Sequence, residues 1–243
     1  MITNEEQRLN AVKRFDNYNF NLNKGLEDIL TLTAEICETP VAFITLIDAD
    51  AQQFKVCKGM DVVQMPRDTS FCTHTIMNTG VMVVEDPLKD ERFSSIPLVV
   101  NQPYIRFYAG APLATEDGQN IGTLCVLDAQ RKSLPLAKQH MLGILAKQAI
   151  HLMELDLCLK LLNQKNNHIT LQNKTLRDIA FTQAHEFRGP LSSLIGFMNL
   201  IKDDDYHAPR EYLVMMDEVV QKLDEKILLV VKSTQQAREV YLA

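Results

Sequence analysis

Hydrophobic positions change their spacing along the chain, and the change divides the sequence into two halves. Between residues 22 and 36 apolar side chains recur every three or four positions, which predicts a helix that ends before Pro40. After Pro40 the pattern turns to β-branched and aromatic residues, typical of strands. The predicted strands lie over 41–47, 53–57, 81–84, 106–112 and 121–127. Thr69 or Ser70 is expected to cap a short helix that runs to Met77. An antiparallel sheet with helices packed on it, an α+β domain, accounts for this order.

The second half carries a heptad repeat. No proline lies between Pro135 and Pro190, so one long helix is expected over residues 136–202. Apolar residues recur there in alternating steps of four and three, and the first core position of the heptads is held by Leu145, Leu152, Leu159, Asn166 and Asn173. Asparagine at this position fixes a parallel register, which predicts a parallel homodimer. The alternative is an amphipathic helix that packs on its own domain.

A helical hairpin is expected to complete the chain. An acidic turn over 203–205 and Pro209 separate the long helix from a second amphipathic helix. Two antiparallel helices with matching apolar seams form a four-helix bundle when a dimer doubles them. The predicted boundaries are 1–135 for the α+β domain, 136–175 for the coiled-coil helix and 176–243 for the hairpin.

Composition narrows the possible functions. The formal charge of −6 without a Lys/Arg block argues against nucleic-acid binding. No apolar run approaches the ~18 residues of a membrane span, and the acidic, polar start is not a secretory signal. Five scattered cysteines without a CxxC pair indicate reduced thiols in the cytoplasm, with no disulfide and no metal site.

Four segments of the first half resemble the GAF domains of bacterial sensor proteins. They read PRDTSFCTHTI over 66–76, VVEDPLKDERF over 83–93, IRFYAGAPL over 105–113 and IGTLCVLD over 121–128. The resemblance covers about residues 5–155. It implies a sheet with a pocket on one face that senses an unknown small ligand or a redox cue. The candidate pocket residues are Arg67, Cys72, His74 and Tyr108.

Two further hypotheses concern the role of the cysteines. Cys72 and His74 are similar to the Cys-His pair of bilin-binding GAF domains. Cys57, Cys72 and Cys125 are similar to the thiols of GAF enzymes that reduce free methionine sulfoxide. The ordinary alternative is that strand cysteines act as small core residues.

His185 is the candidate reactive residue of the second half. A lone histidine on a helix is usually a solvated surface group. Pro190, however, removes a helical hydrogen bond one turn away at a cost of ~3 kcal/mol, which favours a functional kink. The sequence HEFRGPL over 185–191 resembles the H-box of histidine kinases.

The resemblance to histidine kinases implies roles for the residues of this motif. His185 would attack a γ-phosphoryl group and pass it to an Asp of a response regulator receiver domain. Glu186 would act as general base or orienting partner, and Arg188 would meet phosphate. Gly189 stands where many relatives carry Asn or Thr, which predicts weak or absent phosphatase activity.

The chain shows no phosphate-cradling loop, so we expect no cofactor and no autophosphorylation within it. ATP would act only through a histidine kinase ATP-binding domain, either in a longer protein or in trans, and enzyme status stays open. The predicted function is a cytoplasmic two-component sensor module. The alternative is a non-enzymatic GAF scaffold that dimerises and binds a partner, with His185 unused.

Overall fold

The computed structural model of the chain describes residues 5–15, 18, 20 and 24–242, with side chains described as far as 231. The chain divides into two compact units, Met1–Leu162 and Asn163–Ala243.

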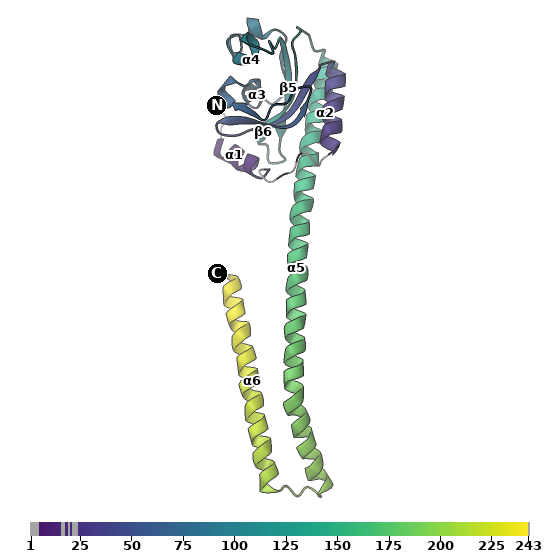
Figure 1. Cartoon of the computed structure of the whole chain (residues 1–243), viewed down its shortest axis with the longest axis vertical. Coiled ribbons are helices and arrows are strands. Elements are labelled where there is room, and N and C mark those ends of the chain that lie inside the picture. Colours follow the sequence, from purple (N-terminus) through teal and green to yellow (C-terminus); the bar gives the residue numbers. More distant parts are fainter. Residues whose placement is uncertain (1–4, 16–17, 19, 21–23, 243) are drawn as a thin grey trace. The chain divides into compact units, whose positions relative to one another are not determined.

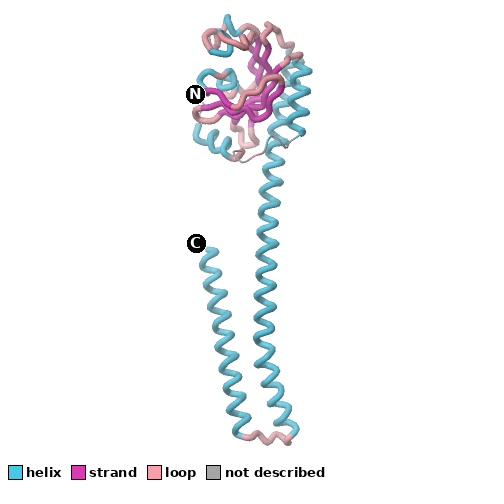
Figure 2. The backbone as a smooth tube through the Cα atoms, in the orientation of Figure 1, coloured by secondary structure: helices cyan, strands magenta, loops and turns pink. Residues whose placement is uncertain are grey.

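A six-stranded antiparallel sheet forms the centre of the first unit, in the order β3-β2-β1-β6-β5-β4 (Figure 2, magenta). The strands are β1 (Val41–Ile47), β2 (Ala51–Lys58), β3 (Gln64–Pro66), β4 (Met82–Val84), β5 (Phe107–Ala114) and β6 (Asn120–Asp128). All five strands predicted from the sequence are confirmed. The three-residue β3 was missed because it is too short to show an alternating pattern.

Helices cover both faces of this sheet (Figure 1). The helices of the first unit are α1 (Glu5–Lys13), α2 (Lys24–Cys37), α3 (Phe71–Thr75), α4 (Pro97–Val100) and the start of α5 (Leu136–Asp203), with short 3-10 turns at Arg67–Thr69 and Pro87–Lys89. One buried cluster joins α1, α2 and α5 to the sheet, and a second joins α3 and the segment around α4 to the opposite face. Residues alternate between the two clusters along β6, as the pleat of a strand requires.

The start of α5 carries two different apolar faces. Its fully buried residues pack on the sheet and are Leu142, Ala146, Ala149, Ile150 and Met153. The start of α5 is therefore an amphipathic helix packed on its own domain. Of the heptad seam, Leu145 and Leu152 pack partly against the same cluster, whereas Leu155 and Leu159 are 56% and 48% exposed. Each residue turns a helix by about 100°, which sets the seam about 120° from the sheet-facing side.

The second unit is a helical hairpin. The helix predicted over 136–202 is confirmed as α5, and α6 (Arg210–Leu242) begins directly after Pro209. The rings of Phe197 on α5 and Tyr212 on α6 lie 6.0 Å apart. The α5 residues that are at least half-buried in this unit share one face and are Gln172, Gln183, Phe187, Pro190, Leu194, Phe197 and Ile201. None of the helices that the structure describes is both long enough and apolar enough to cross a bilayer.

Candidate functional site

An apolar cavity of about 90 Å³ lies on the α3 side of the sheet. Aromatic and aliphatic side chains of β1, β2, β5 and β6 form its floor, and α3 and α4 form its wall. The lining residues are Phe43, Gln52, Phe54, Met60, Val62, Met65, Phe71, Cys72, Leu98, Pro103, Ile105, Tyr108, Cys125 and Leu127. Pockets for drug-sized ligands measure roughly 300–1,000 Å³, so this cavity suits a molecule of only a few atoms.

Two thiols meet at the edge of this cavity. The sulfur of Cys72 on α3 lies 3.7 Å from the sulfur of Cys125 on β6. Both residues are buried, with exposures of 3% and 0%. Two further polar groups converge on the Cys72 sulfur: Gln52 Nε2 donates to it at 3.3 Å, and the hydroxyl of Tyr108 donates to it at 3.5 Å. Cys72 therefore lies in a small polar cluster inside an otherwise apolar core.

Local sequence explains how α3 presents Cys72. Ser70 caps the helix, because its hydroxyl oxygen accepts a hydrogen bond from the Cys72 backbone N–H at 3.0 Å. The Ser70 hydroxyl also donates to the side-chain oxygen of Gln52, which ties the cap to β2. The prediction that Thr69 or Ser70 caps a short helix is confirmed with Ser70, and the helix ends at Thr75 rather than Met77.

A glycine makes room for the tyrosine hydroxyl of the cluster. Gly110 on β5 pairs with Cys125 on β6. A Cβ added at Gly110 would lie 2.1 Å from the hydroxyl oxygen of Tyr108, so only glycine leaves this space free. The Tyr108 hydroxyl also lies 2.7 Å from Thr75 Oγ1, which holds it beside the Cys72 sulfur.

The environment makes the two thiols chemically unequal. Burial raises the pKa of Cys72, but hydrogen bonds from Cys125, Thr123, Tyr108 and Thr45 outweigh it, so the pKa lies below the ordinary value. The hydrogen bond to Cys72 and burial raise the pKa of Cys125. Burial likewise raises the pKa of the Tyr108 hydroxyl, which keeps it a proton donor. The pair therefore favours a thiolate at Cys72 and a thiol at Cys125.

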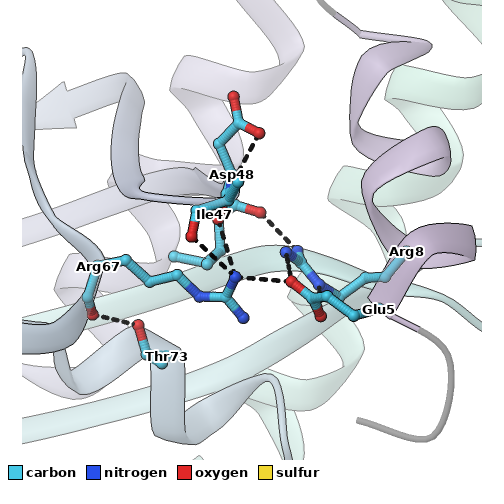
Figure 3. Close-up of polar contacts among 7 residues, drawn as sticks. Glu5, Arg8, Ile47, Asp48, Arg67 and Thr73 are labelled. Carbon is cyan, nitrogen blue, oxygen red and sulfur yellow. Dashed lines mark hydrogen bonds and ion pairs between the residues drawn. The ribbon is translucent and has the colours of Figure 1, made fainter.

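Of the predicted pocket residues, Cys72 and Tyr108 line the cavity, and Arg67 and His74 do not. The Arg67 guanidinium contacts Glu5 at 2.6 Å and the Asp48 carbonyl at 3.2 Å (Figure 3). His74 packs edge-on against Phe93, with ring centroids 4.9 Å apart. Burial and nearby Arg92 lower the pKa of His74, which favours its neutral form.

Sequence reasoning missed Gln52 as a cavity residue. It lies on a strand of mixed polarity and is 2% exposed, with its amide turned toward Ser70 and Cys72. No local pattern marks it, because its partners lie 18 and 20 residues away in the sequence.

The H-box residues lie in the middle of the hairpin on α5. His185, Glu186 and Arg188 are all exposed, and Pro190 is half-buried within the helix. Glu186 forms a long ion pair with Lys226 on α6, at 3.9 Å.

Asn166 and Asn173 are exposed on α5. Among the side chains that the structure describes, up to residue 231, no three His, Cys, Asp or Glu groups gather to hold a metal ion.

The comparison with known proteins follows from this fold. The GAF domain family matches residues 21–152, so the chain belongs to the GAF domain family. It is similar to a cyclic di-GMP phosphodiesterase of Pseudomonas aeruginosa, with 44% identity over 113 residues, 46% of this chain and 19% of that protein. The match therefore spans about a fifth of the length of this relative.

Solved structures with the same kind of fold are more distant in sequence. A domain of a putative two-component sensor histidine kinase from Sinorhizobium meliloti has a TM-score of 0.45 at 17% identity, covering 55% of this chain and 91% of that one. A GAF domain region of a putative membrane protein from Geobacter sulfurreducens has a TM-score of 0.47 at 15% identity, covering 60% and 99%.

Proposed function

We propose that this chain is a sensor module of a two-component signalling pathway. The GAF domain senses a small molecule or redox cue, and the α5–α6 hairpin presents His185 for phosphorylation. The phosphoryl group then passes to an Asp of a response regulator receiver domain. The observation that carries the proposal is the place of His185: it is exposed within the H-box sequence, on the side of α5 opposite the half-buried face that packs toward α6.

Helical geometry supports this placement. The half-buried face of α5 is turned toward α6. A second apolar row, Ala184, Leu191 and Met198, is exposed at heptad spacing about 90° further round the helix. His185 lies about 160° from the first face and about 110° from the second. Covering both apolar faces therefore leaves the imidazole in solvent, where another domain can reach it.

A second copy of the chain suits the exposed apolar rows. On α6 the matching row is Leu213, Val220 and Ile227, exposed by 52%, 49% and 45%. A helix buries two apolar faces when it packs between two neighbours, as in a four-helix bundle. The outward heptad seam of α5, with Asn166 and Asn173 at core positions, supports a parallel homodimer. The proposed bundle is therefore built from two hairpins.

The chemistry assigned to the H-box follows from its side chains. One nitrogen of the neutral His185 imidazole attacks the γ-phosphorus of ATP held by a separate ATP-binding domain, and the bond to the ADP oxygen breaks. The N–H of the other ring nitrogen then becomes more acidic, and Glu186 accepts its proton. The ion pair between Glu186 and Lys226 is exposed, so it holds the Glu186 carboxylate only weakly. Arg188 lies three residues on, next to His185 on the helix surface, and meets the phosphoryl oxygens.

The GAF domain is coupled to α5 by packing within the first unit. Leu142, Ala146 and Met153 of α5 are fully buried in the cluster that also contains β6 residues. A change in the sheet is therefore felt by the helix that carries His185. The described cysteines are all free thiols, which suits the reducing cytoplasm where we place this module.

Phosphate labelling tests this proposal. The chain is incubated with a histidine kinase ATP-binding domain and ATP labelled on the γ-phosphate. We expect acid-labile, base-stable label on the wild type and none on His185→Gln. His168→Gln, which changes another exposed histidine of α5, is the matched control and should label normally. Absence of label from the wild type would favour the non-enzymatic scaffold.

A further inference from the structure

We propose that Cys72 and Cys125 form a peroxide-reactive dithiol that closes to an intramolecular disulfide at the edge of the GAF cavity. The proposal names the cue for the sensing half of the proposed function. It does not depend on His185, because the modification is complete within the first unit. Three features support it: the spacing of the sulfurs, the donors around Cys72, and the adjoining cavity.

The two sulfurs lie close enough to join without rebuilding the fold. Their separation of 3.7 Å exceeds the ~2.05 Å of a disulfide bond by a distance that rotation of two side chains can cover. Cys72 lies on α3, a single short turn of helix, while Cys125 lies on a central strand that is hydrogen-bonded on both sides. Closure is therefore expected to draw Cys72 toward the sheet.

The donors around Cys72 select it as the reacting sulfur. Gln52 Nε2 and the Tyr108 hydroxyl both donate to Cys72, and both donors are themselves buried. Hydrogen bonds to a charged acceptor in a dry site favour the thiolate, which is the nucleophilic form of cysteine. Cys125 lies beside it as the resolving thiol.

The cavity provides space for the oxidant. Its volume of about 90 Å³ admits a molecule the size of water or hydrogen peroxide but not a drug-sized ligand. Met60, Val62 and Met65 line it from a partly exposed segment, so the cavity lies near the surface on that side. A hydroperoxide can thus reach Cys72, while larger reactants are excluded.

The chemistry balances with hydrogen peroxide as the oxidant. The Cys72 thiolate attacks one peroxide oxygen, the O–O bond breaks, and hydroxide leaves to take up a proton. The sulfur of Cys125 then attacks the sulfenic acid on Cys72, the S–O bond breaks, and water leaves with the proton of Cys125. Two thiols lose two electrons in total, and the peroxide is reduced to two molecules of water.

Closure would change the contacts on both faces of β6. Cys72 would leave its hydrogen bonds with Gln52 and Tyr108 as it approaches Cys125. The neighbours of Cys125 on β6, Leu124 and Val126, belong to the cluster that contains the start of α5. Leu124 and Val126 therefore connect the site of closure to the start of the long helix.

Mass spectrometry tests the proposal on the full chain. The exposed Cys158 is changed to Ser to prevent links between molecules. Reduced protein is treated with hydrogen peroxide and then denatured in the presence of an alkylating agent, which blocks the remaining free thiols. The protein is digested without reductant. We expect a linked peptide pair that contains Cys72 and Cys125, with Cys37 and Cys57 alkylated. Tyr108→Phe should slow the reaction roughly tenfold, because the thiolate loses one charge-assisted hydrogen bond.

A second variant keeps the test independent of disulfide closure. In Cys125→Ala, Cys72 should stop at the sulfenic acid, which a dimedone probe traps. The proposal is overturned if Cys72 and Cys125 are both alkylated at a peroxide dose that oxidises Cys57, or if dimedone fails to label Cys72 in folded Cys125→Ala. The readout needs neither ATP nor a kinase, so failure here is distinct from failure of phosphotransfer.

Discussion

Single residues of the GAF domain take their chemistry from neighbours that are distant in sequence. Arg8 is 1% exposed, a rare place for a charged side chain. It donates to both carboxylate oxygens of Glu5, at 2.8 and 2.9 Å, and to the carbonyl of Ile47. Arg67 contacts the same carboxylate (Figure 3). One carboxylate thus binds two guanidinium groups and ties α1 to the loop that follows β1.

Replacement of Glu5 by Gln should weaken the contact between α1 and the loop that follows β1, by an amount that depends on pH. Hydrogen bonding to Arg8, followed by Arg67, lowers the pKa of Glu5 from 4.5 to about 2. A carboxyl group with a lower pKa in the folded state stabilises the fold at pH values above its unfolded-state pKa. This stabilisation is lost as the pH falls through its folded-state pKa. Because Glu5 is partly exposed, solvent screens the pair. We expect the melting temperature at pH 7 to fall by about 2–4 °C.

Thermal melting followed by circular dichroism checks this prediction from pH 7 to 2. The difference between wild type and Glu5→Gln should shrink as the pH falls from 4.5 toward 2. Glu6→Gln, at an exposed neighbouring position, serves as control and should melt like the wild type. A difference that stays constant to pH 2 would contradict the assigned role of the carboxylate.

At the scale of elements, two faces of α5 have different roles. One face completes the core of the GAF domain, and from Leu155 onward the other presents an apolar heptad seam to solvent. A seam of this length is typical of a coiled coil. It is therefore the part of the helix where a second copy is expected to bind.

Charges placed in this seam should separate the dimer. We expect the wild type to be a dimer in light scattering and the double variant Leu155→Lys, Leu159→Lys to be a monomer, because dimerisation would bury both ammonium groups. Both leucines are about half exposed in the single chain, so its fold should survive. Leu161→Lys changes an equally exposed leucine about 160° from the seam and should remain dimeric. A monomeric wild type would exclude the parallel homodimer.

At the scale of the whole molecule, the proposed function depends on the rotational phase of one helix. The residues of α5 that pack on the GAF sheet and His185, the residue proposed to accept phosphate, belong to the same helix. A heptad repeat tolerates whole heptads, whereas an insertion of four residues is a stutter that changes the local supercoil. For the proposed function, the rotational phase of α5 therefore matters more than the length of this helix.

Insertions after Asn166 test this dependence on phase. Adding seven residues should leave the rate of His185 labelling within about twofold of the wild type. Adding four should change that rate by about fivefold or more, the size of ordinary allosteric coupling. Labelling with the separate ATP-binding domain measures both. Equal rates in the two insertion variants would show that the helix transmits no rotational signal.

Local patterns in the sequence were enough to predict most elements. The alternation of strands and the three- or four-residue spacing of helices arise from neighbours along the chain, so β1, β2, β5, β6, α2 and α5 were predicted within a few residues of their bounds. The short α1, α4 and β3 were missed, because so few residues establish no period. The order of the GAF motifs indicated the family correctly.

The tertiary structure decided which residues that are distant in sequence contact one another. That Cys72 touches Cys125, that Gln52 reaches both Ser70 and Cys72, and that Arg67 turns to Glu5 rather than to the cavity depend on strand order and register. The sequence alone determined which residues were capable of such chemistry and which helix carries His185. Sequence periodicity describes only one element at a time, whereas a site forms where several elements pack together, and packing joins residues that no local pattern relates.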